Sequence, residues 1–185
     1  MALVPVSYFL TKGKGIHQKE LRAFETALRE AGIHTCNLVK VSSIIPPGCK
    51  RISKEEGMRL LQPGAITFAV LAQSATNEPG QLVGAGIGLA QPTDDTVHGY
   101  LTEVEETIGR TDADIRQDAE EMAIENLISE WGHENFDAES VQETGKKKYR
   151  LFRKELSVDS IAQTAKGADK NQYTVVVAAA VFILP

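Results

Sequence analysis

Two adjacent serine hydroxyls are the first candidates for chemistry in this chain of 185 residues. Ser42 and Ser43 follow a short apolar stretch and stand just before the double proline Pro46-Pro47. An activated serine hydroxyl is a nucleophile toward a carbonyl carbon. A Gly-x-Ser-x-Gly elbow is missing and no histidine is marked as the base, so a serine hydrolase has only the residue types in its favour. The alternative is structural, because serines are common in turns.

Two acidic side chains are the second candidates. Glu103 and Glu105 stand on alternate positions of the stretch 101–105. If this stretch is a strand, both carboxylates lie on one face. Neighbouring carboxylates raise the pKa of one another and burial raises it further, and a carboxylic acid that stays protonated near neutral pH is a proton donor. The alternative is a pair of solvated acids at a strand end.

The remaining motifs indicate structure rather than chemistry. Gly84-Ala-Gly-Ile-Gly88 lacks the Lys-Ser/Thr of a phosphate loop and lies inside an apolar run, so it predicts a strand with one bare face. A bare face lets another layer approach closely. The four histidines show no metal-ligand spacing, and we expect no metal site. The run 146–148, all lysine, is expected in a solvated loop.

Composition and charge narrow the class of protein. The chain has 20 Lys and Arg against 25 Asp and Glu, a net charge of −5, which argues against binding nucleic acid through a general basic field. Cys36 and Cys49 cannot build a disulfide-rich scaffold, and a reducing compartment is the default. The longest apolar run, residues 173–184, is too short to span a bilayer. We expect a cytoplasmic, single-domain protein over residues 1–185, with no membrane partner.

The first half of the chain is expected to form two strands and two helices, at 4–10, 37–41, 18–31 and 53–61. Residues 11–15, Thr-Lys-Gly-Lys-Gly, are expected to break the first strand. Residues 44–48 are expected to end regular structure, because two consecutive prolines cannot join a central ladder. Apolar residues of the first helix recur at spacings of three and four and share one face: Leu21, Phe24, Leu28 and Ala31.

The second half is expected to be richer in strands, at 65–73, 82–90, 97–104, 151–163 and 173–184, with one long helix at 112–131. Residues 132–150 are polar and predict a loop. The last two strands follow each other closely and predict a hairpin. The last strand is almost wholly apolar and is expected to be central and buried on both faces. The pattern as a whole is α+β, with strands in runs and two main helices between them.

The sequence resembles the pyruvoyl-dependent arginine decarboxylases over most of its length. The strongest match is Asn37-Leu-Val-Lys-Val-Ser-Ser-Ile-Ile-Pro-Pro47. Other matching segments follow in the family's order: Ala23–Leu28, Ala31–Ile33, Pro79-Gly80, the strand through Gly88, His98–Glu105 and Val175–Leu184. This many motifs at compatible spacing make the resemblance specific.

The resemblance implies that the chain cuts itself between Ser42 and Ser43. The Ser43 Oγ would attack the Ser42 carbonyl carbon, and elimination and hydrolysis would leave a pyruvoyl group on Ser43. The products would be a β chain of residues 1–42 and an α chain of residues 43–185. The pyruvoyl group would form a Schiff base with L-arginine and release carbon dioxide, giving agmatine. Members of the family use neither PLP nor metal.

The resemblance also assigns the site residues. Glu103 would protonate the substrate carbon, Asn37 would bind the oxyanion or the pyruvoyl amide, and Leu28 would contact the substrate's methylenes. Glu25 stands where the family commonly carries Asp to hold the guanidinium. The carboxylate is retained, so arginine is the expected substrate, and lysine, ornithine or another amino acid stays open.

The fold that the resemblance implies is a layered αββα sandwich with mixed sheets and two main helices. The resemblance also implies assembly as a homotrimer, or as a dimer of trimers, with active sites between neighbouring protomers. Two other functions stay open: a pyruvoyl-dependent decarboxylase of a different amino acid, and an uncleaved, non-catalytic trimeric relative. The sequence does not decide whether agmatine would feed polyamine biosynthesis or acid resistance.

Overall fold

The computed structural model describes residues 3–132, 142–145, 148–151 and 154–185. Within these residues the helices are α1 (Glu20–Ala31), α2 (Lys54–Leu60) and α3 (Asp112–Glu130). The strands are β1 (Ser7–His17), β2 (Asn37–Lys40), β3 (Ile44–Ile45), β4 (Lys50–Arg51), β5 (Ile66–Thr76), β6 (Leu82–Pro92), β7 (Gly99–Ile108), β8 (Gln142–Gly145), β9 (Lys148–Leu151), β10 (Lys154–Lys166) and β11 (Tyr173–Ile183).

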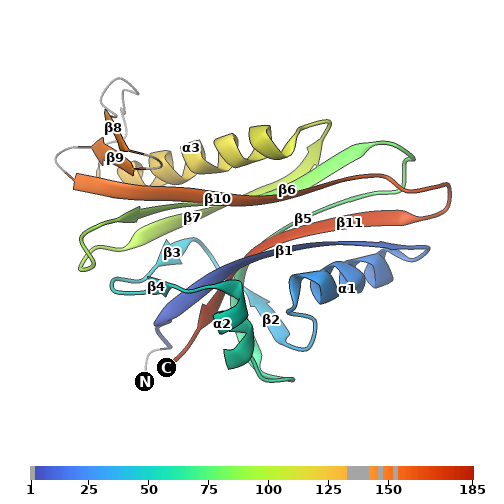
Figure 1. Cartoon of the computed structure of the whole chain (residues 1–185), viewed down its shortest axis with the longest axis horizontal. Helices are drawn as coiled ribbons and strands as arrows, with labels where there is room; N and C mark the ends of the chain where they lie inside the picture. Colours follow the sequence, from blue (N-terminus) through green and yellow to red (C-terminus); the bar gives the residue numbers. More distant parts are fainter. Residues whose placement is uncertain (1–2, 133–141, 146–147, 152–153) are drawn as a thin grey trace.

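Two stacked sheets form the body of the molecule (Figure 1). Among the described residues, one sheet has the strand order β2-β5-β11-β1-β4 and the other has the order β3-β7-β6-β10-β9-β8. The helix α1 covers the outer face of the first sheet and α3 covers that of the second (Figure 1). The predicted αββα sandwich is therefore confirmed. The first sheet is mixed, as expected, because β2 and β4 pair in parallel with their neighbours, whereas the pairs of the second are antiparallel.

The first strand is longer than the sequence predicted. We expected residues 11–15 to break it, but β1 continues through them and pairs with β11 from Ser7 to His17. The glycines have a packing role here. A Cβ on Gly13 would lie 2.2 Å from the Ala27 carbonyl oxygen, and one on Gly15 would lie 2.1 Å from that of Ala23. Both glycines therefore let the backbone of α1 approach the sheet.

The packed face of α1 also differs from the expected one. Ala23, Ala27 and Ala31 are fully buried, whereas Leu21 is 77% exposed. Phe24 and Leu28 pack only at the margin of this core. The close approach that the β1 glycines permit selects small side chains for the interface, so the larger apolar residues lie to the side.

The glycine strand β6 behaves as predicted. Its bare face receives α3, and a Cβ on Gly88 would lie 2.0 Å from the Ala119 carbonyl oxygen. The helix α3 begins with a capping box between Thr111 and Asp114. This packing fixes the neighbouring strand β7, because β7 pairs with β6 and also contacts α3.

Three further predictions need correction. The last two long strands do not form a hairpin: β10 pairs with β6 in one sheet and β11 lies between β1 and β5 in the other. The almost wholly apolar composition of β11 explains this position, because the centre of the first sheet is where both faces of a strand are covered; the strand is central and buried, as predicted. The expected loop 132–150 contains β8 and β9, while residues 133–141 and 146–147 of it, with most of the lysine run, fall outside the described residues. The segment expected to end regular structure begins with the short strand β3.

Candidate active site

The segment that carries Ser42 and Ser43 crosses from one sheet to the other. On one side, the Val41 N–H donates to the Ala69 carbonyl oxygen in β5, at 3.1 Å. On the other side, the Leu101 N–H in β7 donates to the Ser43 carbonyl oxygen, at 2.7 Å. The peptide bond between the two serines therefore lies between two anchored points, one in each layer of the sandwich. Such a fixed backbone is what an intramolecular reaction needs.

The residues after Ser43 are also held in place. Ile44 and Ile45 pair with Tyr100 and Gly99 of β7, and the Ile45 side chain is fully buried. Ser43 is half-buried and Ser42 is exposed. Ser42 lines an apolar cavity of about 370 Å³ together with Leu3, Pro5, Val41, Ile44, Phe68 and Phe182.

Glu103 lies two residues along β7 from the anchor of Ser43. This separation corresponds to about 7 Å along the strand. Glu103 is on the same face of β7 as Leu101, which is buried between the two sheets. Glu103 itself is half-buried, and this burial raises the pKa of its carboxyl group above the usual range, while Lys40 lowers it and Glu105 raises it. A raised pKa is the direction that a proton donor at this position needs.

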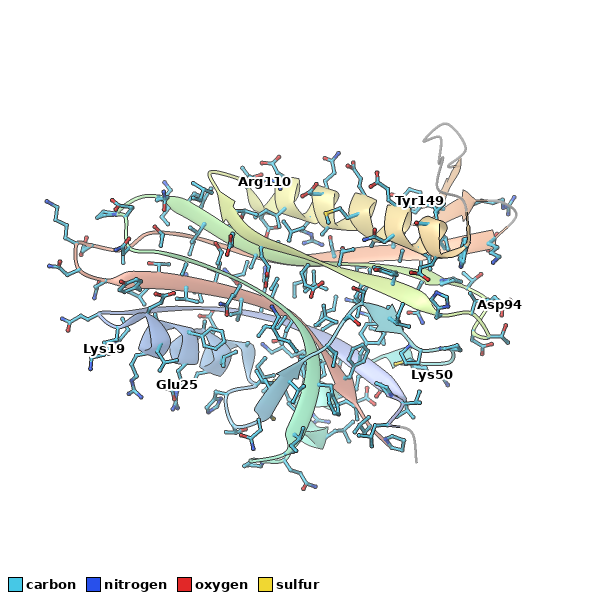
Figure 2. The ribbon with its side chains drawn as sticks, turned by 180° about the vertical axis from the view of Figure 1, so that it is seen from behind. Lys19, Glu25, Lys50, Asp94, Arg110 and Tyr149 are labelled. Carbon is cyan, nitrogen blue, oxygen red and sulfur yellow. The ribbon has the colours of Figure 1, made fainter. Side chains whose placement is uncertain are left out.

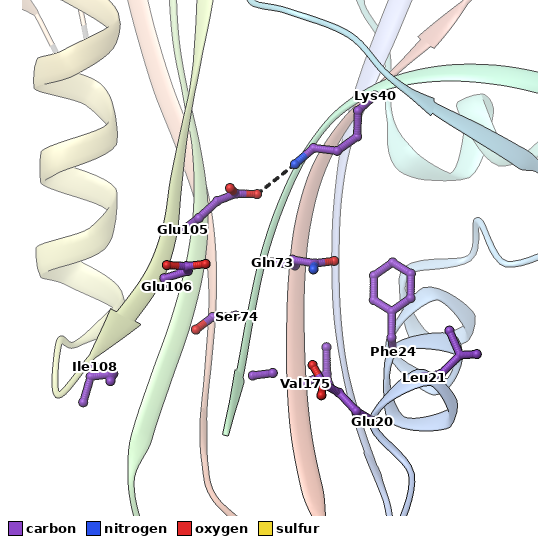
Figure 3. Close-up of a pocket in the computed structure, with 11 residues that line it drawn as sticks. Glu20, Leu21, Phe24, Lys40, Gln73, Ser74, Glu105, Glu106, Ile108 and Val175 are labelled. Atoms are coloured by element: carbon purple, nitrogen blue, oxygen red, sulfur yellow. Dashed lines mark hydrogen bonds and ion pairs between the residues drawn. The ribbon is translucent and has the colours of Figure 1, made fainter. Parts of the chain in front are cut away.

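Glu105 does not stand free beside Glu103, because it forms an ion pair with Lys40. The distance from Lys40 Nζ to Glu105 Oε1 is 3.0 Å (Figure 3). Lys40 is the last residue of β2, so this ion pair joins the first sheet to the second. Nothing in the local sequence indicates the contact, because the two residues are 65 positions apart.

A β-bulge in β7 places two consecutive carboxylates on one cleft. The register between β6 and β7 shifts between Gly84 and Gly86, and Glu106 has a φ of 52°. Adjacent residues of a regular strand point to opposite faces, whereas a bulge redirects one of them. Glu105 and Glu106 consequently line the same cleft (Figure 3).

This cleft has a volume of about 830 Å³ and opens beside the ion pair. Its walls come from α1, β2, β5, β7 and β11 (Figure 3). They combine three carboxylates and one ammonium group with polar and apolar surface: Glu20, Leu21, Phe24, Lys40, Gln73, Ser74, Ala75, Glu105, Glu106, Ile108 and Val175. Lys40, Glu20 and Glu106 were not singled out by the sequence. Lys40 lies inside the strongest family-like segment, which was the one available signal for it.

The other predicted site residues lie apart from this arrangement. Asn37 begins β2, and its side-chain amide donates to the Gly64 carbonyl oxygen at 2.8 Å. Leu28 packs beside the core under α1. Glu25 points away from the sheet that α1 covers (Figure 2). Its carboxylate accepts hydrogen bonds from Arg22 at 2.9 Å and Arg29 at 2.6 Å, and the bond from Arg29 is the main reason why its pKa is lowered.

Among the described residues, no group of three or more His, Cys, Asp and Glu side chains is arranged to hold a metal ion. No helix in the same part of the chain is long and apolar enough to cross a membrane.

Comparison of the chain with known proteins identifies its family. Residues 7–184 match the family model described as pyruvoyl-dependent arginine decarboxylase. The chain belongs to this family. The match extends through both sheets and includes the segment with Ser42 and Ser43, so the resemblance seen in the sequence is confirmed.

Relatives of this decarboxylase support the assignment over the full length. A probable pyruvoyl-dependent arginine decarboxylase of Chlorobium limicola is 44% identical over 183 residues, which cover 99% of each chain. Pyruvoyl-dependent arginine decarboxylase 2 of Methanosarcina mazei is 40% identical, and the pyruvoyl-dependent arginine decarboxylase of Nitrosopumilus maritimus is 38% identical, each over 98% of both chains. The chain is accordingly an enzyme of the decarboxylase class, and the family name implies a pyruvoyl prosthetic group.

Proposed function

We propose that the chain cuts itself between Ser42 and Ser43 and then decarboxylates L-arginine to agmatine and carbon dioxide. The observation that carries this proposal is the position of the Ser42–Ser43 peptide bond. It is held between Ala69 of one sheet and Leu101 of the other, close to a half-buried glutamic acid, in a chain of this family. The whole of residues 1–185 would act as one domain that is processed after folding.

The cutting reaction uses atoms of the two serines and water. The Ser43 Oγ attacks the Ser42 carbonyl carbon, the C–N bond breaks, and the proton of the hydroxyl goes to the nitrogen, which leaves an ester. Loss of the Ser43 Cα proton and cleavage of the Cβ–O bond release the Ser42 carboxylate and leave dehydroalanine at position 43. Water then replaces the nitrogen, and ammonia leaves. The slow first step benefits from the anchored backbone on both sides.

The two products would stay together after cutting. The β chain of residues 1–42 contains β1, α1 and β2, and β1 lies in the sheet beside β11 of the α chain. The pairing of β1 with β11 extends over Ser7 to His17. The Ser42 carboxylate and the new group at position 43 would each remain attached to the sheet that already holds them.

The surroundings of Ser43 fit a pyruvoyl group, because this residue is half-buried and its own carbonyl oxygen is fixed by Leu101. Such a group supplies a carbonyl that condenses with an amine and accepts the electron pair released with carbon dioxide. Glu103 would donate the proton that replaces the carboxylate on the substrate carbon. Since Ser43 and Glu103 together account for electrophile and acid, we propose that neither PLP nor a metal ion takes part.

Within one chain, the residues that line the cleft beside the Lys40–Glu105 ion pair do not include Asn37, Glu25 or Leu28, and Glu103 is not among them either. We therefore assign Asn37, Glu25 and Leu28 to a site that a neighbouring protomer completes, in a homotrimer or a dimer of trimers. Asn37 would bind the oxyanion or the pyruvoyl amide, Glu25 the guanidinium group and Leu28 the methylenes of the substrate. Glu25 would first have to exchange one of its arginine partners for the substrate. The cytoplasm is the location we expect from the sequence.

A panel of amino acids tests the substrate. We expect carbon dioxide release from L-arginine to exceed that from lysine, ornithine and aspartate, measured with carboxyl-labelled substrates on processed protein. The matched variant Glu25→Asp restores the side chain common in the family and is expected to change KM for arginine more than kcat. Faster turnover of lysine or ornithine than of arginine would assign the processed enzyme to a different amino acid.

A further inference from the structure

The ion pair between Lys40 and Glu105 links the two halves of the proposed site. Lys40 stands directly before Val41, whose N–H is anchored on Ala69, and two residues before Ser42. Glu105 stands two residues after Glu103 on β7. This contact of 3.0 Å thus joins the segment with the bond to be cut to the strand with the proton donor, in addition to the hydrogen bond from Leu101 to Ser43.

We propose that Lys40 is a positioning residue for decarboxylation, which acts by pairing with Glu105 and so balances the charge around Glu103. This inference rests on the proposed function, because it takes Glu103 as the proton donor. Lys40 itself is not assigned any contact with the reacting atoms.

The arrangement of the other charged groups near Glu103 makes the charge balance between Lys40 and Glu105 specific. Lys40 provides the one positive charge among the described residues that line the cleft, against the carboxylates of Glu20, Glu105 and Glu106. The neighbouring strands β5 and β6 carry no charged residue along their lengths. The charged side chains of α3 lie on the other side of β7, because α3 packs against the face of β7 that bears Thr102 and Val104. Lys12 reaches between the sheets elsewhere, where its ammonium group donates to the Ala162 carbonyl oxygen at 2.7 Å.

The two members of the ion pair act on Glu103 in opposite directions. Burial is the main cause of the raised pKa of Glu103, Lys40 lowers this pKa, and Glu105 raises it. Without Lys40, the carboxylates would be uncompensated and Glu103 would keep its proton to a higher pH. Without Glu105, the positive charge of Lys40 would no longer be balanced by its ion-pair partner. Glu103 would then lose its proton at a lower pH.

A purely mechanical role for the ion pair makes a different prediction. After cutting, Lys40 would belong to the β chain and Glu105 to the α chain, so the pair would also hold the two products together. In that role, removal of either partner breaks the same contact and has the same consequence. The two roles are therefore distinguished by comparing the partners, not by removing one of them.

The test is a comparison of Lys40→Met with Glu105→Gln, each purified and checked for complete processing by mass. The readout is the pH dependence of kcat for arginine, whose alkaline limb reports the loss of the proton from the donor in the substrate complex. We expect this limb to move to higher pH in Lys40→Met and to lower pH in Glu105→Gln. Lys40→Arg retains the charge and is expected to keep the wild-type limb.

Limbs that stay in place, or that move in the same direction in both variants, would overturn the proposal in favour of a mechanical clamp. If the Lys40→Met chain fails to fold or to process, Glu105→Gln remains decisive, because an unshifted or upward-shifted limb there also overturns it. Failure of the proposed function is seen separately: a Glu103→Gln enzyme with wild-type turnover would remove Glu103 as the donor, whatever the Lys40 and Glu105 variants show.

Discussion

The Ser43→Ala chain is expected to remain a single polypeptide of 20.1 kDa and to release no carbon dioxide from arginine above background. Alanine has no Oγ, so neither the ester nor dehydroalanine can form, and no other residue supplies the pyruvoyl carbonyl in the proposed reaction. The loss of activity is complete rather than partial, because the prosthetic group itself is missing. Mass spectrometry under denaturing conditions and an assay with carboxyl-labelled arginine measure the two effects.

Ser42→Ala is the matched control for this prediction. It deletes the neighbouring hydroxyl but keeps the carbonyl carbon that is attacked, together with the anchors on Ala69 and Leu101. We expect this variant to cut itself and to decarboxylate arginine. A Ser43→Ala chain that still cuts or still decarboxylates would show that the prosthetic group does not come from Ser43.

Glu103→Gln is expected to cut itself normally and then to decarboxylate arginine about 10²- to 10⁴-fold more slowly, the range typical for loss of a general acid. Glutamine has nearly the same shape but no acidic proton to give to the substrate carbon. Stopped-assay rates on fully processed protein measure the effect, and the processed fraction is determined by mass in the same sample.

The pH dependence of the unmodified enzyme provides the control for this assignment. Burial raises the pKa of Glu103, so its acid form persists above the range of an exposed glutamate. Because the proposed donor works in its protonated form, activity is expected below this raised pKa and is lost as pH rises through it. Glu103→Asp keeps an acid on a shorter side chain and is expected to retain more activity than Glu103→Gln. Equal rates in the Glu103→Gln and unmodified enzymes would contradict the assignment.

Much of the fold could be predicted from local patterns. The apolar strand β11 and the helix α3 have signals that depend only on their own residues, and both were found where expected. The break predicted at residues 11–15 was wrong because the glycines there allow the backbone of α1, a separate element, to pack closely on the strand. The predicted hairpin was wrong because its second strand finds partners in another sheet. Neither outcome can be predicted from the local sequence, because each depends on contacts with a distant element.

The candidate site shows the same limit. Alternation predicted that Glu103 and Glu105 share one face of a strand, and both lie in β7. It could not reveal that Glu105 is paired with Lys40, since that contact joins two sheets across 65 positions. It also could not reveal the bulge that turns Glu106 toward the cleft, because an inserted residue changes the alternation only when the partner strand is present. Contacts of this kind depend on how strands and sheets are placed next to each other, which the spacing of residues in the sequence does not specify.

Self-cutting at the Ser42–Ser43 bond is the central claim, and the intact mass of the purified, unmodified protein under denaturing conditions tests it most directly. The account predicts two chains, residues 1–42 and residues 43–185, with the larger one blocked to Edman degradation and changed in mass by borohydride. A single chain of 20.1 kDa after long incubation would contradict it.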